Sequence, residues 1–323
     1  MLRIGTIGTG AIATEFVEAV KSRKDCKINV VYSRSIEKGK LFSLKSQLSV
    51  HVVDNFDDML DKMDIVYIAS PNGLHYQQAK YFLQNQKNVI LEKPLAFTEA
   101  EAKDLESVAL VNKVILMEAM KPVHTPNFNL IKQEVKNTNY FLANFMWCNY
   151  SSRMNNIINE DFYKDSIFDE NLGKGTLYDA AVYPVEVAIS LFGKVKEVKC
   201  LSHKLKNNVD INNLIMLRHA NGVLSSITVS KAANSSNICE FLSYDKTLEI
   251  NNVNSMIDLT IKDRVTKKSK TFNENTEKHI MNYEINTMIS MIKNNDFDLM
   301  KDYLQNTIET IRVLEGIDKK LGE

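Results

Sequence analysis

The feature that most constrains the fold is a glycine-rich turn close to the N-terminus. Residues 4–7 (I-G-T-I) form a short apolar run that is typical of a buried strand, and residues 8–13 (G-T-G-A-I-A) follow it at once. In this G-x-G-x-x-A pattern, Gly8 permits a tight turn, Gly10 lets the backbone approach a pyrophosphate, and Ala13 lets the next helix pack closely on the strand. The helical spacing of residues 11–22 completes a strand, turn and helix. This context predicts a dinucleotide site at a helix N-terminus.

Strand and helix patterns alternate as far as about residue 120. The predicted strands are residues 4–7, 28–32, 64–69, 88–91 and 114–117, and the predicted helices are residues 11–22, 36–47, 57–62, 75–85 and 98–111. Strands and helices that alternate at this spacing build parallel βαβ units. We therefore predict an α/β fold whose first domain, residues 1–121, is a doubly wound parallel sheet of the Rossmann type.

The pattern changes beyond residue 121. A predicted helix at residues 127–135 leads into β-like segments with few helices between them, at residues 140–149, 195–203, 214–219, 223–230 and 238–243. Residues 218–223 contain Asn-Gly and predict a hairpin. Residues 277–321 are helical, with a break near 294–296. The second domain, residues 122–323, is therefore predicted to be α+β with a large, mostly antiparallel sheet, joined to the first by a hinge.

Composition excludes several classes of function. Lysine plus arginine and aspartate plus glutamate number 40 each in 323 residues, whereas nucleic-acid-binding domains carry a basic excess or stripe. The sequence shows neither an apolar stretch long enough to span a bilayer nor a signal-peptide pattern. The six histidines are scattered, and no two cysteines are close enough to suggest a zinc site or a disulfide framework. We expect a cytoplasmic protein with no metal, no nucleic-acid partner and no membrane association.

The end of the second predicted strand bears on the choice of cofactor. An NAD enzyme usually places Asp or Glu there to hold the ribose 2′-hydroxyl, whereas the 2′-phosphate of NADP needs a cation. Residues 31–35 read V-Y-S-R-S, with no carboxylate before Glu37. Ser33 and Arg34 therefore favour NADP, and Lys38 adds charge. The alternative is that Arg34 is an ordinary solvated loop residue and that NAD is also accepted.

Three further segments carry a resemblance to a known family. The triplet Glu92-Lys93-Pro94 follows the predicted strand at residues 88–91, and ligands of open α/β sheets bind at such strand ends. Together with the glycine turn, this triplet resembles the Gfo/Idh/MocA oxidoreductase family. Residues 70–75 (S-P-N-G-L-H) are similar to a family loop that lies along the cofactor, and residues 173–184 (G-K-G-T-L-Y-D-A-A-V-Y-P) are similar to its motif G-G-x-L-x-D-x-G-x-[YH]. The resemblance covers essentially the whole chain.

The resemblance implies an NAD(P)-dependent dehydrogenase or reductase that acts on a hydroxyl or carbonyl carbon of a sugar, polyol or cyclic diol. By position, Lys93 is the family's catalytic lysine, and Asp179 and Tyr183 are its partners. Hydride transfer at a carbinol needs an acid or base within reach of the oxygen, and whether Lys93 or Tyr183 is the proton donor stays open. The tyrosine at position 183 resembles the dihydrodiol dehydrogenase and glucose-fructose oxidoreductase branch of the family in residue type. Ala181, by contrast, stands where the family usually has a glycine.

The resemblance also implies the cofactor-binding residues, a cis Lys93–Pro94 bond, and a second domain that binds substrate and forms a homodimer or higher oligomer. For His75 the alternative is that it caps or packs its helix, and Glu92 is expected to support the loop rather than to act as an acid. Two other functions stay open: a catalytically silent sensor of dinucleotide or sugar, and a redox-neutral sugar-modifying enzyme. The predicted cofactor-binding residues are Gly8, Gly10, Ala11, Ile12, Ser33, Arg34, Ser70, Pro71, Asn72, His75, Glu92 and Lys93.

Overall fold

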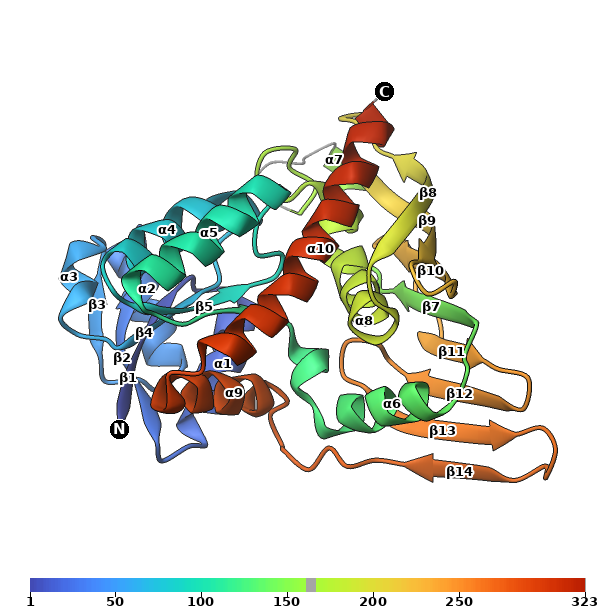
Figure 1. Cartoon of the computed structure of the whole chain (residues 1–323). Coiled ribbons are helices and arrows are strands. Elements are labelled where there is room, and N and C mark those ends of the chain that lie inside the picture. Colours follow the sequence, from blue (N-terminus) through green and yellow to red (C-terminus); the bar gives the residue numbers. More distant parts are fainter. Residues whose placement is uncertain (161–166, 323) are drawn as a thin grey trace. The chain divides into compact units, whose positions relative to one another are not determined.

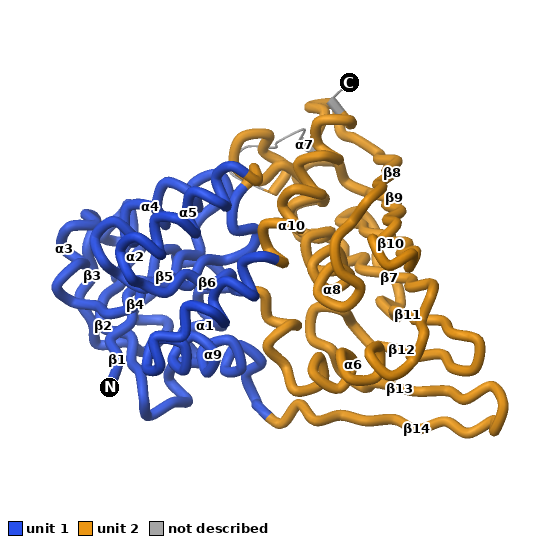
Figure 2. The backbone as a smooth tube through the Cα atoms, in the orientation of Figure 1, with its two compact units in different colours: residues 1–96, 100–119, 277–305 blue, residues 97–99, 120–276, 306–323 orange. Residues whose placement is uncertain are grey.

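A computed structural model describes residues 1–160 and 167–322 and divides the chain into two compact units (Figures 1 and 2). Unit 1 contains Met1–Ala96, Ala100–Ala119 and Glu277–Gln305, and unit 2 contains Phe97–Glu99, Met120–Thr276 and Asn306–Glu323. The chain leaves unit 1 after Ala119, close to the predicted hinge. It returns for Glu277–Gln305, which the sequence had assigned to the second domain. Helical periodicity marks this segment as a helix but does not show which sheet it covers.

Unit 1 is built on a six-stranded parallel sheet in the order β3-β2-β1-β4-β5-β6. This order reverses between β1 and β4, as in a Rossmann fold. Its strands are β1 (Leu2–Ile7), β2 (Cys26–Tyr32), β3 (His51–Val53), β4 (Ile65–Ile68), β5 (Asn88–Glu92) and β6 (Leu116–Ala119). Its helices are α1 (Ala11–Lys21), α2 (Ile36–Lys45), α3 (Asp57–Leu60), η1 (Asn72–Leu74), α4 (His75–Gln84), most of α5 (Glu99–Asn112), α9 (Met281–Asn294) and the start of α10 (Phe297–Gly322).

The burial of these strands explains why the first domain could be predicted. All four residues of β4 and four of the five in β5 are buried, because helices cover both faces of a parallel sheet. Such strands are nearly continuous apolar runs, which the sequence shows clearly. The prediction missed β3, because three residues at the edge of the sheet are too few to show a period.

Unit 2 is built on an eight-stranded sheet in the order β14-β13-β12-β11-β7-β10-β9-β8. Neighbours are antiparallel except β7 and β10, which run parallel. The predicted mostly antiparallel sheet is confirmed, although β12, β13 and β14 were not predicted. Its strands are β7 (Leu142–Cys148), β8 (Val195–Lys204), β9 (Asp210–His219), β10 (Leu224–Ser230), β11 (Ile238–Leu242), β12 (Lys246–Asn251), β13 (Ile257–Asp263) and β14 (Ser269–Phe272). Its helices are η2 (Lys121–His124), α6 (Pro126–Asn137), α7 (Met154–Glu160), η3 (Leu177–Ala181) and α8 (Val182–Phe192).

One face of this sheet carries the elements of the candidate site. The π-helical turn η3 packs on β9 and β10, and α8 packs on β7 and β10. Side chains of β9 alternate, so that Ile215 and Leu217 are buried while Leu214 and Met216 are exposed on the opposite face. The predicted hairpin joins β9 to β10, with a backbone hydrogen bond from Gly222 N–H to the His219 carbonyl (3.0 Å).

That hairpin differs from the predicted one in its turn. A two-residue Asn-Gly turn needs a positive φ at both positions, whereas only Gly222, at φ 94°, has one. The loop is therefore a three-residue turn that ends at Gly222. Along the described part of the chain, no helix is long and apolar enough to cross a membrane.

Candidate active site

The glycine turn after β1 has the geometry that a pyrophosphate requires. Gly8 has a φ of 106°, and a Cβ there would lie 2.4 Å from the carbonyl oxygen of Ala69, so no other residue fits. Gly10 is the N-cap of α1 and makes no side-chain capping bond. A Cβ on Gly10 would meet nothing within 4 Å. The space beside Gly10 is therefore open, and the first N–H groups of α1 lack intrahelical acceptors, as at any helix N-terminus that binds an anion.

The end of β2 presents one cation and two hydroxyls beside the N-terminus of α2. Arg34 is exposed, whereas Ser33 is buried. Ser35 is the N-cap of α2, since its hydroxyl accepts from Lys38 N–H (3.2 Å) and donates to Glu37 (2.9 Å). This bond and the backbone N–H of Glu37 lower the pKa of that carboxyl. Arg34 is thus available to a ligand, while Ser35 is engaged in the structure of the helix.

His75 connects the two loops that were predicted to border the cofactor. Its ring lies between two carbonyl oxygens, with Nδ1 2.8 Å from that of Pro94 and Nε2 2.9 Å from that of Ser70. Burial lowers the pKa of His75, against these two contacts, which raise it. The side chain has no exposed surface, which favours the alternative that it packs its helix, while a cofactor contact stays a prediction. The ring thus links the loop after β4 to the turn after β5.

Two buried carboxylates support the turn at the end of β5. Glu92 accepts a hydrogen bond from the hydroxyl of Tyr67 (2.5 Å), and Glu118 accepts one from Leu95 N–H (2.7 Å). The Lys93–Pro94 bond is cis, as the resemblance implies, and the Lys93 side chain is half-buried. The sequence prediction chose Glu92 as the support of the loop backbone. It missed Glu118, whose contact with Leu95 joins β6 to this turn across a separation that no local pattern shows.

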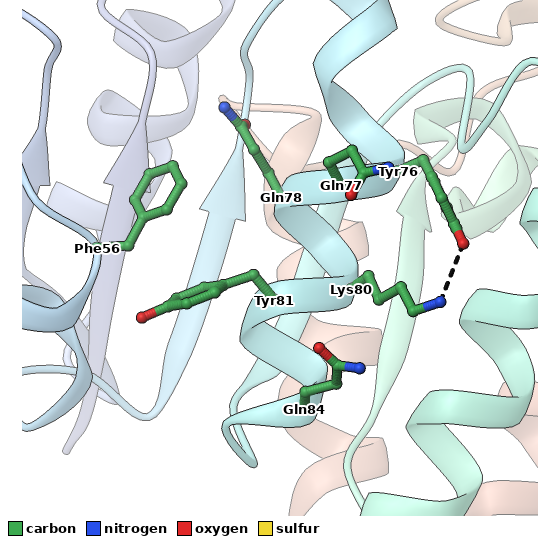
Figure 3. Close-up of a pocket in the computed structure, with 7 residues that line it drawn as sticks. All are labelled: Phe56, Tyr76, Gln77, Gln78, Lys80, Tyr81 and Gln84. Carbon is green, nitrogen blue, oxygen red and sulfur yellow. Dashed lines mark hydrogen bonds between the residues drawn. The ribbon is translucent and has the colours of Figure 1, made fainter.

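A shallow pocket lies along α4, on the same unit (Figure 3). Phe56 and Tyr81 face each other across it, and the Lys80 ammonium reaches the hydroxyl of Tyr76 (3.1 Å). Gln78 lines the pocket and accepts a hydrogen bond from the Ser70 hydroxyl (2.7 Å). Ser70 therefore touches both His75 and Gln78, which fixes the loop after β4. None of the predicted site residues lines this pocket.

In unit 2, a buried aspartate organises the start of η3. Asp210 accepts hydrogen bonds from Leu177 N–H (2.9 Å) and from the Asn213 side chain (2.5 Å). Gly175 has a φ of 81°, and a Cβ there would lie 2.6 Å from two oxygens of Asp210. Burial raises the pKa of Asp210 to about 6, although both hydrogen bonds lower it. The glycine of the 173–184 motif is thus needed for close contact with a carboxylate that the sequence prediction missed.

Asp179 and Tyr183 follow on η3 and α8, beside two side chains from the sheet. Asp179 forms an ion pair with Lys231 (2.8 Å), and both side chains are largely buried. The ring of Tyr183 lies edge-on to that of Trp147, with centroids 6.3 Å apart. Lys231 directly follows β10, and Trp147 lies on β7. The sequence gives no sign of Lys231, because a single lysine after a strand belongs to no pattern.

The segment after Lys93 also contacts η3. Phe97 belongs to unit 2, where its carbonyl accepts a hydrogen bond from the hydroxyl of Tyr178 (3.0 Å) and its ring packs edge-on against that of Tyr178. The Lys174 ammonium lies 4.9 Å from the centroid of Phe97 and pairs with Asp318 (3.2 Å). Phe97 therefore ties the segment that follows Lys93 to the residue that precedes Asp179.

Comparison with known proteins decides the family. Residues 2–120 match the family described as an oxidoreductase family with an NAD-binding Rossmann fold, and residues 147–252 match the GFO/IDH/MocA C-terminal domain. The chain is 31% identical to the scyllo-inositol 2-dehydrogenase (NADP(+)) IolU of Bacillus subtilis, over 100% of this chain and 98% of the relative. This chain belongs to the Gfo/Idh/MocA family. The family resemblance and the oxidoreductase class predicted from the sequence are thereby confirmed.

More distant members of the Gfo/Idh/MocA family extend this comparison. A trans-1,2-dihydrobenzene-1,2-diol dehydrogenase of Xenopus laevis is 24% identical over 73% of this chain and 72% of the relative. The fold also matches KijD10, a 3-ketoreductase from Actinomadura kijaniata solved with NADP and TDP-benzene, with a TM-score of 0.85 at 18% identity over 98% of this chain and 96% of the other. Levoglucosan dehydrogenase, solved with NADH and levoglucosan, gives a TM-score of 0.84 at 18% identity over 99% and 98%. These two structures confirm the fold.

The raised pKa of the buried Asp210 predicts how the free energy of unfolding depends on pH. Its pKa of about 6 lies above the ordinary value of 3.8, so the folded protein holds a proton that the unfolded chain has released. Stability from this group is therefore greatest at low pH and is lost as the pH rises from about 4 to 6. An Asp210→Asn variant keeps an acceptor for Leu177 N–H without this titration. We expect wild-type stability to fall relative to the variant by roughly 1–2 kcal/mol between about pH 4.5 and 7.5.

Chemical denaturation of the wild type and of Asp210→Asn across that pH range measures the difference in their free energies of unfolding. The contributions of other titrating groups are the same in both proteins and cancel in this difference. A difference that stays constant with pH would contradict the titration of Asp210 in the folded state.

Proposed function

We propose that this protein is an NADP-dependent dehydrogenase or reductase that interconverts a hydroxyl and a carbonyl group on a sugar, polyol or cyclic diol. The observation that carries the proposal is the match of both parts of the chain, residues 2–120 and 147–252, to the two domains of the Gfo/Idh/MocA family. The motif at residues 92–94 lies in the first part and the motif at residues 173–184 in the second. The resemblance of these two motifs to those of the family supports a role for Lys93, Asp179 and Tyr183 on one substrate.

The relatives support the same class of substrate. The name of the Bacillus subtilis relative specifies scyllo-inositol and NADP(+), and that of the Xenopus relative specifies a cyclic diol. Both substrates carry neighbouring hydroxyl groups on a six-membered ring. The chain is similar to these proteins over most or all of its length, which favours a polyhydroxylated ring as substrate here as well.

Each residue has a distinct task in the proposed mechanism. The bound NADP would be held by the open N-terminus of α1 and by Arg34, and it supplies the acceptor or donor of hydride. The substrate oxygen exchanges a proton with Lys93 Nζ or with the Tyr183 hydroxyl as the carbon changes oxidation state. The side chain of Lys93 is half-buried and so stays partly accessible. Asp179 accepts a hydrogen bond and orients the substrate.

A catalytically silent sensor of the same fold is the alternative function. A sensor has no need of a lysine, an aspartate and a tyrosine together, and this chain has all three. A redox-neutral sugar-modifying enzyme with tightly bound cofactor is a second alternative. A net change in the near-ultraviolet absorbance of the nicotinamide during turnover distinguishes a dehydrogenase from such an enzyme.

Removing the amine of Lys93 tests the mechanism. We expect Lys93→Met to lower kcat by about 10²- to 10⁴-fold while NADPH affinity stays near wild type, because the glycine turn and not this residue holds the pyrophosphate. Tyr183→Phe should lower kcat within the same range, and Asp179→Asn should lower it less. If Lys93 and Tyr183 act on one proton, the loss of kcat in their double variant should be far smaller than the product of the two single losses.

Turnover of scyllo-inositol and NADPH binding are measured in parallel, with Lys87→Met as the control. Lys87 precedes the opposite end of β5 and carries the same charge, so its loss should leave kcat unchanged. A Lys93→Met enzyme with near wild-type kcat would contradict the mechanism and favour the sensor.

Cofactor preference depends on Arg34 in this proposal. We expect Arg34→Ala to weaken NADPH binding by about 10- to 100-fold, since a hydrogen bond to a charged group is lost, and to leave NADH binding nearly unchanged. Lys45→Ala, at the far end of α2, is the matched control. Fluorescence titration measures both cofactors. If Glu37→Gln instead weakens NADH selectively, and Arg34→Ala changes nothing, Glu37 holds the ribose and the NADP preference is wrong.

We also propose a homodimer or higher oligomer. The outer face of the large sheet exposes a group of apolar side chains on β8, β9 and β10, and such groups mark interaction surfaces. They are Leu201, Leu214, Met216 and Leu224. We expect light scattering to give at least the mass of a dimer at micromolar concentration, and Met216→Lys to shift it toward the monomer. A monomeric wild-type protein would contradict this proposal.

A cytoplasmic location is proposed as well. The four cysteines (Cys26, Cys148, Cys200 and Cys239) are all free thiols, which favours a reducing compartment.

A further inference from the structure

Lys231, the ion-pair partner of Asp179, has no task in the mechanism above. From the geometry of the ion pair we infer that this pair recognises a vicinal diol, with one substrate hydroxyl donating to Asp179 and its neighbour accepting from Lys231. Lys231 would then be a specificity-determining residue that requires a neutral substrate with a second hydroxyl beside the reacting carbon. This inference rests on the proposed function, whose substrate class it narrows.

The pair is held in place by the backbone. Lys231 N–H donates to the carbonyl of Ile211 (3.0 Å), and the carbonyl of Lys231 accepts from Ser151 N–H (2.8 Å). Asp179 lies on η3, which packs on β9 and β10. The relative positions of the two side chains are therefore set by the large sheet and not by a mobile loop. A pair fixed in this way can offer a constant spacing to a ligand.

The ammonium of Lys231 keeps capacity for a ligand. The side chains of Lys231 and Asp179 are 19% and 17% exposed, so each is mostly enclosed but can still be reached. An ammonium has three donors, and within the part of the chain that the structure describes Lys231 directs its ammonium to Asp179 alone. Two donors of the ammonium therefore remain for a substrate. A carboxylate has more than one acceptor site on each oxygen.

The spacing and charge of the pair match a diol. Nζ and Oδ2 lie 2.8 Å apart, about one hydrogen-bond length, and neighbouring hydroxyl oxygens on a ring are separated by a similar distance. Each hydroxyl can both donate and accept, so the two can lie across the pair. Because the charges of Asp179 and Lys231 cancel, the pair does not attract an anionic substrate. The ring of Trp147, beside Tyr183, gives the apolar face of such a substrate a surface to pack on.

A minimal pair of probes tests the inference. trans-Cyclohexane-1,2-diol carries the reacting hydroxyl and one neighbour, whereas cyclohexanol lacks the neighbour. We expect the wild-type protein to prefer the diol by about 10- to 100-fold in kcat/KM with NADP⁺, as expected for hydrogen bonds to charged groups. Lys231→Met should reduce this preference to near unity, and Lys231→Arg should restore part of it. A lysine that only positions Asp179 would instead change both substrates by the same factor.

The control is Lys246→Met. Lys246 forms a partly buried ion pair with Glu134 on another part of unit 2 (3.1 Å), so its replacement also removes an ion pair of this unit and should leave the preference unchanged. Binding of both probes to the NADPH-loaded protein, measured by saturation-transfer NMR, gives a readout without turnover. A binding preference for the diol that Lys231→Met removes supports the inference even if no turnover occurs, in which case the proposed function alone fails. A preference that survives Lys231→Met, or equal or undetectable binding of the two probes, overturns the inference.

Discussion

The close approach of Gly8 to the carbonyl of Ala69 is the constraint on which unit 1 depends. The two residues follow β1 and β4, the neighbouring strands between which the order of the sheet reverses. Such a switch point opens a crevice at the carboxyl ends of the strands. A side chain at position 8 would push the turn away from β4 and tilt α1. The direction of α1, and hence of its free N–H groups, follows from this one contact.

In unit 2, a buried carboxylate fixes the position of a turn. The π-helical turn η3 needs a partner for Leu177 N–H, and Asp210 provides it from β9. A buried carboxylate costs free energy, as its raised pKa shows. Gly175 lets the backbone come close to this carboxylate, where a side chain would collide with it. The turn that carries Asp179 is therefore held by a carboxylate whose burial costs stability near neutral pH and whose hydrogen bonds offset part of that cost.

The sequence predicted the features that local patterns determine. Buried parallel strands are apolar runs, and the glycine turn needs small residues at fixed spacing, so the order of elements in unit 1 and the turn at Gly8 and Gly10 could be predicted. β3, β13 and β14 have too few residues or too few buried ones to show a period. Glu118, Asp210 and Lys231 contact residues 23, 33 and 52 positions away, and no spacing in the sequence records such contacts. For the same reason the partition of Glu277–Gln305 could not be predicted.

This difference bears on how the proposed cofactor-binding and substrate-binding residues can vary. The proposed cofactor-binding turn of unit 1 uses backbone N–H groups, so it requires small residues at fixed positions and no particular functional side chain. In unit 2, the proposed substrate-binding residues are Trp147 on β7, Asp179 on η3, Tyr183 on α8 and Lys231 after the end of β10. Four elements each contribute one side chain, and a change in any of them alters the ligand without disturbing the sheet. Relatives of this chain are named for an inositol and for a cyclic diol, and in our proposal the Asp179–Lys231 ion pair sets which hydroxyls this chain accepts.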